Sequence, residues 1–215
     1  MALQTGRPAP PAERSAQLSH QVRQLLEQSA EIVPFHGWKH TEFVRDKAVE
    51  FANDRDADVD LVEAAALVHD LNYLVAPNSA PSAGRVARCD LLSGCGFGAD
   101  DVGRIEQIIN DAHTAHRQRD VDLETACLSD ADTLYKALPI TPVLFSHRYL
   151  SENGMQLGAL AEKIIREQLS KLQEGYYFYD QRLTQRYRPW VEANLRLWET
   201  VLEALDDPAI ASLID

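Results

Sequence analysis

The chain has 215 residues, of which 45% are hydrophobic and 25% charged, so it can build a folded core. Its formal net charge of −12 disfavours binding to a nucleic acid polymer, because such binding depends on Lys and Arg. The odd number of cysteines, three, matches no zinc module and is typical of reduced thiols. Since neither a leader-like segment nor an apolar stretch of membrane-spanning length is evident, we expect a cytoplasmic protein with no membrane partner.

The predicted elements are all helices. Residues 1–11 are expected to form a flexible arm. Apolar residues at helical spacing then predict a helix over residues 11–33, and Asp58 is a plausible N-cap for a later one. The remaining helices are predicted over residues 38–52, 59–74, 82–93, 99–115, 123–137, 143–151, 156–172 and 180–205. Because no longer alternating pattern favours strands, we expect an all-α fold, one bundle of about eight or nine helices over residues 12–215.

A few histidines and aspartates stand in apolar surroundings. His69 and Asp70 follow the run Ala64-Ala65-Ala66-Leu67-Val68, His40 lies on the apolar face of the helix before it, and Asp132 is flanked by Leu128 and Leu134. A buried ionised group without a partner is costly, and a divalent cation is a suitable partner for all four side chains. Two imidazoles and two carboxylates form a mixed nitrogen and oxygen donor set that suits Mn, Fe, Ni, Co, Zn or Mg.

The order of these residues resembles the HD-domain superfamily of metal-dependent phosphohydrolases. The segment His36-Gly37-Trp38-Lys39-His40 is similar to a family segment of the form His-Asp-Trp-x-His, and Ser129-Asp130-Ala131-Asp132-Thr133-Leu134 is similar to the segment that carries the last ligand. The resemblance covers residues 32–137, and the tail is similar to that of small stand-alone bacterial members. Gly37 and Phe43 depart from the pattern, since Asp and often Arg are expected there.

The resemblance implies that His40, His69, Asp70 and Asp132 bind one divalent metal ion at the centre of a helical bundle. It also implies hydrolysis of a phosphoester bond, on a nucleotide or a small phosphorylated metabolite. The metal lowers the pKa of its bound water in such sites, and Asp70 is both a ligand and a candidate base. Lys136, one turn after Asp132, is a candidate for neutralising phosphate charge. Arg117, Arg119 and Arg148 are weaker candidates.

The number of metals separates two enzyme classes of this fold. Diiron oxygenases of the fold use additional histidines, one of them soon after the His-Asp pair, but residues 71–111 contain none. This absence favours one metal and hydrolysis. His113 is a candidate general acid or phosphate contact, and His116 is interpreted as a solvated helix end. A diiron oxygenase that uses His113 or His116, and a nucleotide-binding sensor domain, remain as alternatives.

The other candidates are interpreted as structural. His36 is expected to support the ligands from behind, and His20 and His147 to be structural or at the surface. The aromatic residues of segment 176–190 are expected to pack in the core or an interface rather than stack on a base. The last helix has an apolar stripe that could cover the bundle or form a homodimer contact.

Overall fold

The computed structural model describes residues 10–113, 116–117 and 119–214. Within these ranges the chain forms ten α-helices, nine of them at least ten residues long, two short 3-10 helices and no strand, which confirms the all-α prediction. The flexible arm was predicted for residues 1–11, and its first nine lie outside the described ranges. None of the helices in the described part combines the length and apolar character needed to cross a bilayer.

The helices follow the predicted order, with differences at their ends. The first helix ends five residues earlier than predicted, the seventh extends further at both ends, and a short tenth helix was not foreseen. Their bounds are α1 (Pro11–Gln28), α2 (Trp38–Asn53), α3 (Val59–Val68), η1 (Leu71–Leu74), η2 (Pro81–Gly84), α4 (Arg85–Gly94), α5 (Ala99–Ala112), α6 (Leu123–Ala137), α7 (Ile140–Asn153), α8 (Leu157–Gln173), α9 (Gln181–Leu205) and α10 (Pro208–Ala211).

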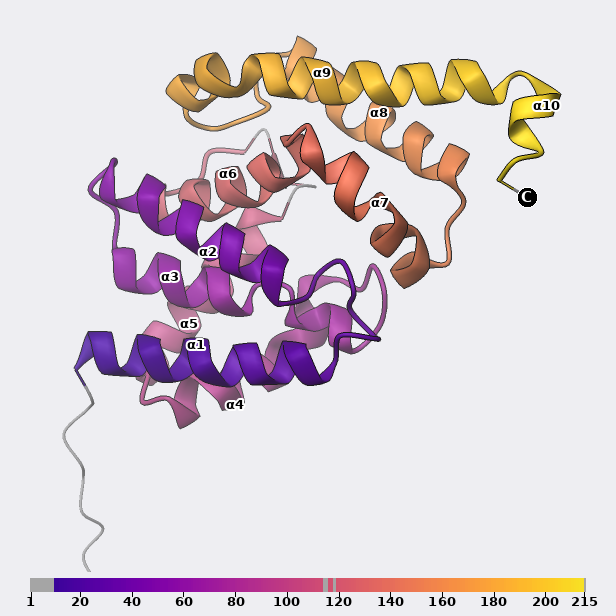
Figure 1. Cartoon of the computed structure of the whole chain (residues 1–215). Helices are drawn as coiled ribbons and strands as arrows, with labels where there is room; N and C mark the ends of the chain where they lie inside the picture. The colour runs from indigo at the N-terminus through magenta and orange to yellow at the C-terminus, as the bar shows by residue number, and fades with distance from the viewer. Residues whose placement is uncertain (1–9, 114–115, 118, 215) are drawn as a thin grey trace, which may run out of the picture.

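Helix α3 is the central element of the core. Six of its ten residues are buried, including the whole run from Ala64 to Val68, because α1, α2, α5 and α6 all pack against it (Figure 1). The alanines keep these neighbours close, since a methyl group takes little space between helices. The Asp58 side chain caps the helix by accepting a hydrogen bond from the Leu61 N–H at 3.1 Å, as the sequence predicts. This packing fixes the end of α3 inside the protein.

The α-helical conformation stops before the His69–Asp70 pair, whereas the sequence predicted a helix that continues to residue 74. Asp70 has φ −101° and ψ 11°, outside the α-helical region, and η1 follows directly. The Asn72 side chain stabilises this corner, because its amide donates to the Ser79 carbonyl at 2.7 Å while the Ser79 hydroxyl donates to the Asn72 carbonyl. The turn therefore places His69 and Asp70 at a helix end rather than along a continuous helix.

The C-terminal helices form a separate layer on α6. Helices α8 and α9 pack against each other, and α9 also contacts α6, on the side of the bundle opposite α1 (Figure 1). The aromatic side chains of Tyr177, Phe178 and Tyr187 are buried there, as expected for packing residues, whereas Trp190 is exposed. Leu160 and Trp198 join α8 to α9 in a smaller apolar cluster. This layer closes the bundle above the C-terminal part of α6.

Candidate metal centre and adjoining cavity

Three of the four predicted metal ligands meet at one point in the protein. His40 comes from the first turn of α2, and His69 and Asp70 from the end of α3. Asp70 Oδ2 lies 3.0 Å from Nε2 of each imidazole, and the two Nε2 atoms are 3.4 Å apart. One donor atom from each residue lies within 4.8 Å of the others, so this group could hold a metal ion.

Asp132 lies beside this group on α6. Its Oδ1 atom is 3.6 Å from His40 Nε2, and its Oδ2 atom accepts a 2.5 Å hydrogen bond from Lys136 Nζ, one helical turn later. The fold thus brings the fourth predicted ligand next to the other three and leaves one of its oxygens facing them. Lys136, predicted to neutralise phosphate charge, is paired with that aspartate.

The hydrogen bonds of His69 suit metal binding. Its Nδ1–H donates to the Ala66 carbonyl at 2.8 Å, and since a carbonyl can only accept, the proton must be on Nδ1. In the neutral ring the lone pair is therefore on Nε2, the atom that faces Asp70. His40 Nδ1 is buried with no hydrogen-bond partner. Its ring is held by aromatic contacts instead, edge-on to Tyr135 at a centroid distance of 4.6 Å.

The charges of the group also fit a cation. Burial opposes ionisation of Asp70, but the charge of His69 and hydrogen bonds from both imidazoles outweigh it and hold the pKa of Asp70 well below its usual value. Burial lowers the pKa of His40, which keeps this imidazole neutral with a lone pair to donate. Burial lowers the pKa of His69, but the charges of Asp70 and Asp132 outweigh burial and raise this pKa, so His69 holds a proton beside Asp70 that a divalent ion would displace. Once His69 has lost this proton, the group offers imidazole nitrogens and carboxylate oxygens, a donor set suited to such an ion.

A buried hydrogen-bonded pair, His36 and Glu152, lies next to this group and was not predicted from the sequence. His36 donates from Nδ1 to Glu152 of α7, whose other oxygen accepts the backbone N–H groups of Phe35 at 2.9 Å and His36 at 3.1 Å. The His36 ring also stacks on Tyr73 at a centroid distance of 3.6 Å. Glu152 thereby fixes the segment that leads into α2 and so the start of the helix that carries His40.

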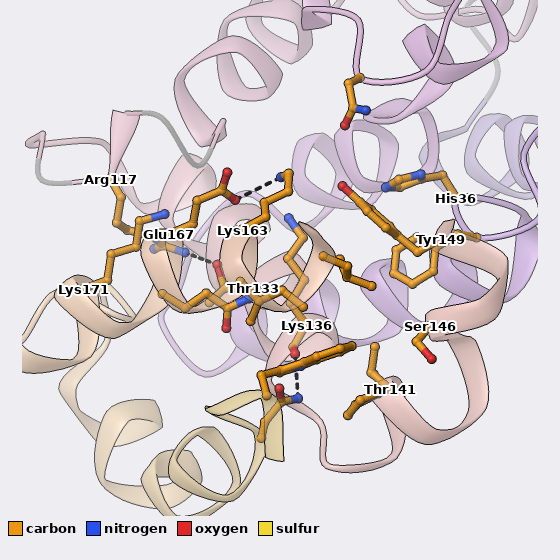
Figure 2. A pocket seen from close by; sticks show the side chains of 18 of the residues that line it. His36, Arg117, Thr133, Lys136, Thr141, Ser146, Tyr149, Lys163, Glu167 and Lys171 are labelled. Atoms are coloured by element: carbon orange, nitrogen blue, oxygen red, sulfur yellow. Dashed lines mark hydrogen bonds and ion pairs between the residues drawn. The ribbon is translucent and has the colours of Figure 1, made fainter. Parts of the chain in front are cut away.

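A cavity of about 560 Å³ adjoins the group (Figure 2). His36 and Tyr73 line the cavity on the side of the His40–His69–Asp70 group, and Lys136 reaches it from α6. The opposite wall comes from α7, α8 and α9, which lie outside the 32–137 segment on which the sequence motif depends. Its lining is mixed, with apolar side chains such as Trp198 and Leu160 next to several charged ones. The volume is within the range of small-molecule sites in proteins.

His113 follows the end of α5 and lines the same cavity. Burial and the positive charge of Lys136 lower the pKa of His113, which favours the neutral ring at pH 7. His116 is half-buried, and its Nδ1 bonds to the Asn110 carbonyl at 2.9 Å. Neither belongs to the His40–His69–Asp70 group. His20 and His147 are exposed.

Arg117, a candidate phosphate contact, is instead held by the protein. It donates to Asp130 Oδ1 at 2.8 Å, to the Ser129 carbonyl at 2.9 Å and to the Thr133 hydroxyl. Asp130 is completely buried and also accepts the backbone N–H of Tyr179 at 2.7 Å. This aspartate therefore ties α6 both to the residues that follow α5 and to the start of α9. Arg119 and Arg148 are exposed.

Comparison with known proteins gives structural relatives only. No protein-family model matches the chain, and no curated protein matches it in sequence. The crystal structure of Bacillus subtilis YpgQ matches with a TM-score of 0.62 and 21% identity over 91% of this chain and 98% of YpgQ. YpgQ in complex with ADP matches with the same TM-score and 22% identity over 92% and 99% of the two chains.

A structure from Lactobacillus plantarum matches with a TM-score of 0.67 and 18% identity over 92% of this chain and 97% of that one. At these identities the similarity concerns the fold. It extends over the C-terminal helices as well as the motif segment, since about nine tenths of the chain is covered in each case.

Proposed function

We propose that this protein is a metal-dependent phosphohydrolase of the HD type that acts on a nucleotide or a small phosphorylated metabolite. The observation that carries the proposal is the meeting of His40, His69 and Asp70 within 4.8 Å, at a buried place beside a cavity of about 560 Å³. The order of these residues and of Asp132 along the chain is that of the HD motif. The ADP complex of the structural relative YpgQ supports a nucleotide as ligand.

In this proposal His40, His69, Asp70 and Asp132 hold one divalent ion, and residues 12–215 work as one unit. When bound, the ion lowers the pKa of a coordinated water and polarises the phosphoryl oxygens. Asp70 accepts a proton from the attacking water, whose oxygen forms the new bond to phosphorus while the bond to the leaving group breaks. Lys136 stabilises the additional negative charge that develops on the phosphoryl oxygens, and it is held in place by Asp132.

His113 is suited to a separate role on the cavity wall. Its lowered pKa means that a neutral imidazole faces the substrate at pH 7, able to donate one hydrogen bond and to accept another. Such a neutral ring can orient the phosphoryl group, whereas the lowered pKa disfavours the imidazolium form that a general acid requires. A change of His113 to Gln keeps a hydrogen-bond donor, so an orienting role predicts a milder loss in H113Q than in H113A.

The direct test is turnover by metal-stripped protein that is resupplied with Mn, Mg, Ni, Co, Zn or Fe. Hydrolysis should depend on the added metal for p-nitrophenyl phosphate and for members of a panel of nucleotides and sugar phosphates. His69→Ala and Asp70→Ala should abolish it, whereas His20→Ala, a change at an exposed histidine of α1, should not. Equal turnover by H69A and the unmodified protein would contradict the proposal.

The same preparation distinguishes the two alternatives. One metal ion per chain and no oxygen consumption would exclude a diiron oxygenase. Nucleotide binding without turnover under every metal would instead identify a sensor.

A further inference from the structure

A second pocket, of about 380 Å³, lies beside the segment that leads into α2. Its walls come from the end of α1, from residues 30–37 and from the start of α2, with Tyr135 of α6 and Arg148 of α7 completing them. Among the described lining residues it shares only Phe35 with the larger cavity. The volume is at the lower end of the range of small-molecule sites. The proposed hydrolysis makes no use of this pocket.

The inner wall of the pocket is apolar. The side chains of Leu26, Val33, Phe35 and Trp38 line it, and all four are buried in the protein core. Two of them are aromatic, and aromatic side chains contribute large, rigid contact surfaces to binding sites. This wall suits the apolar body of a small molecule.

Tyr135 brings a polar group to this apolar wall. Its side chain is only 4% exposed, yet its hydroxyl has no hydrogen-bond partner in the described part of the chain, whereas a buried tyrosine normally finds one. Burial raises the pKa of Tyr135 to about 12, so the hydroxyl keeps its proton at neutral pH and can donate a hydrogen bond. The positive charge of Arg148 opposes part of this rise, in agreement with the position of both residues in one pocket.

The charged residues at the rim differ in their pairing. Glu27 accepts a hydrogen bond from Arg23 at 2.8 Å, and Lys39 donates one to Glu42 at 2.9 Å, so each is paired with a neighbour on its own helix. Arg148 pairs with no carboxylate of the described residues. The pocket therefore combines one unpaired cation with one unpartnered hydroxyl donor.

These two donors fit a carboxylate. The Arg148 guanidinium lies over the Phe145 ring at 5.4 Å from its centroid, a contact through the face that leaves its N–H groups available at the edge. The planar fork of an arginine matches the two oxygens of a carboxylate, and the Tyr135 hydroxyl supplies a further donor. A single unpaired cation in a chain of net charge −12 suits a monoanion better than a dianionic phosphate.

We propose that this pocket binds a small carboxylate with an aromatic or aliphatic body, and that it is an effector site for the metal centre. Two rings that line it also pack on the His40 imidazole, Tyr135 at a centroid distance of 4.6 Å and Phe35 at 6.0 Å. An occupant therefore touches the side chains that hold a candidate metal ligand in place. The binding of the carboxylate is independent of the proposed function, and only its effect on the metal rests on that function.

The test is a titration of ¹⁵N-labelled, metal-stripped protein with phenylacetate, followed by NMR chemical shifts. The signals of Gly37 and Trp38 should move and saturate, with a dissociation constant of about 1 mM or tighter for a ligand of this size. Phenylacetamide has nearly the same shape without the charge and should bind about 10-fold more weakly. Shifts centred on Thr133 and Thr141, which line only the larger cavity, would overturn the inference.

Three variants assign the binding to the two donors. Arg148→Gln, at an exposed residue, should weaken phenylacetate about 10-fold or more. Tyr135→Phe should weaken it about 3-fold while the melting temperature stays unchanged or rises, because the hydroxyl has no partner in the described part of the protein to lose. Arg196→Gln removes an exposed cation of α9 outside the pocket and should have no effect. Equal binding by R148Q and the unmodified protein would refute the site.

The effector role has its own readout, the affinity for Mn²⁺. Saturating phenylacetate should change this affinity about 5-fold or more, and by linkage Mn²⁺ should change the phenylacetate affinity by the same factor. R148Q should abolish the effect, whereas a carboxylate that ligates the ion directly would still act in R148Q. An unchanged Mn²⁺ affinity would refute the effector role.

The outcomes for this pocket and for the proposed function are separable. Phenylacetate binding that depends on Arg148, in a protein that hydrolyses no phosphoester, would sustain the pocket and refute the hydrolase. Metal-dependent hydrolysis without any binding of phenylacetate would have the reverse meaning.

Discussion

Replacement of Glu152 by Ala should destabilise the protein strongly. The carboxylate is almost fully buried and accepts three hydrogen bonds, two from backbone N–H groups and one from the His36 ring. Each donor left without a partner costs about 1–3 kcal/mol. Because the site can relax or admit water, we expect a net loss of about 3–5 kcal/mol, a large share of the stability of a typical domain.

Glu152→Gln should cost much less, for a reason visible in the geometry. Both backbone N–H groups bond to the same oxygen, Oε2, and an amide oxygen in that place would keep both bonds. The amide nitrogen would then face His36 Nδ1, which can accept if the ring proton moves to Nε2. We therefore expect a loss of about 1–2 kcal/mol for E152Q.

Urea unfolding followed by far-UV circular dichroism measures both values, with Glu162→Ala at an exposed glutamate of α8 as the control. A loss below about 1 kcal/mol for E152A, or equal losses for E152A and E152Q, would refute the reasoning.

The same residue predicts a dependence on pH. Burial raises the pKa of Glu152, but the hydrogen bond and charge of His36 outweigh burial and bring the pKa below its ordinary value of 4.5. A carboxyl whose pKa is lower in the folded state stabilises the fold above its unfolded pKa, and the contribution is lost as the pH falls through the folded pKa. The stability difference between the unmodified protein and E152Q should therefore be constant near neutrality and narrow below about pH 4. A difference that widens on acidification would contradict the assignment.

Two further substitutions test how the fold positions the site. A Cβ at Gly37 would lie 2.8 Å from the Val33 carbonyl oxygen, so Gly37→Ala should destabilise the protein by about 1–3 kcal/mol in thermal unfolding. The control is Gly103→Ala in α5, where a Cβ would meet no neighbouring element within 4 Å, and this change should be neutral or stabilising. Asp130→Ala would remove the carboxylate that pairs with the buried Arg117 guanidinium, so it should lower the free energy of unfolding by about 3–5 kcal/mol. Because Asp130 also accepts the Asp180 N–H, limited proteolysis of this variant should cut near the start of α9. An unchanged digestion pattern would argue against the anchoring role of Asp130.

The features that the sequence predicted depend on short stretches of chain. The α6 bounds agree with the prediction at both ends, because Asp122 caps the helix and apolar periodicity runs to Ala137. The Asp58 cap is similarly local. The four candidate metal ligands could be identified because apolar neighbours in the sequence mark them as buried. The structure places His40, His69 and Asp70 together, with Asp132 beside them.

The features that the sequence did not predict depend on partners far along the chain. Glu152 lies 116 residues from His36, and nothing near Glu152 in the sequence marks it as buried. Asp130 was noted only as part of the motif, although its hydrogen bonds to residues about 50 positions later fix the C-terminal layer. The end of α3 was misplaced because the apolar pattern continues through Leu71 and Leu74, while the backbone turns at Asp70.

Metal binding by the isolated protein tests the central claim most directly. Metal-stripped protein titrated with Mn²⁺ should bind one ion per chain, and at 100 times the dissociation constant the ion should add about 2.7 kcal/mol to the stability, which raises the melting temperature by roughly 5–10 °C. His69→Ala and Asp70→Ala should abolish both effects, and His20→Ala should retain them. Absence of binding by the unmodified protein, or binding that persists unchanged in D70A, would contradict the account.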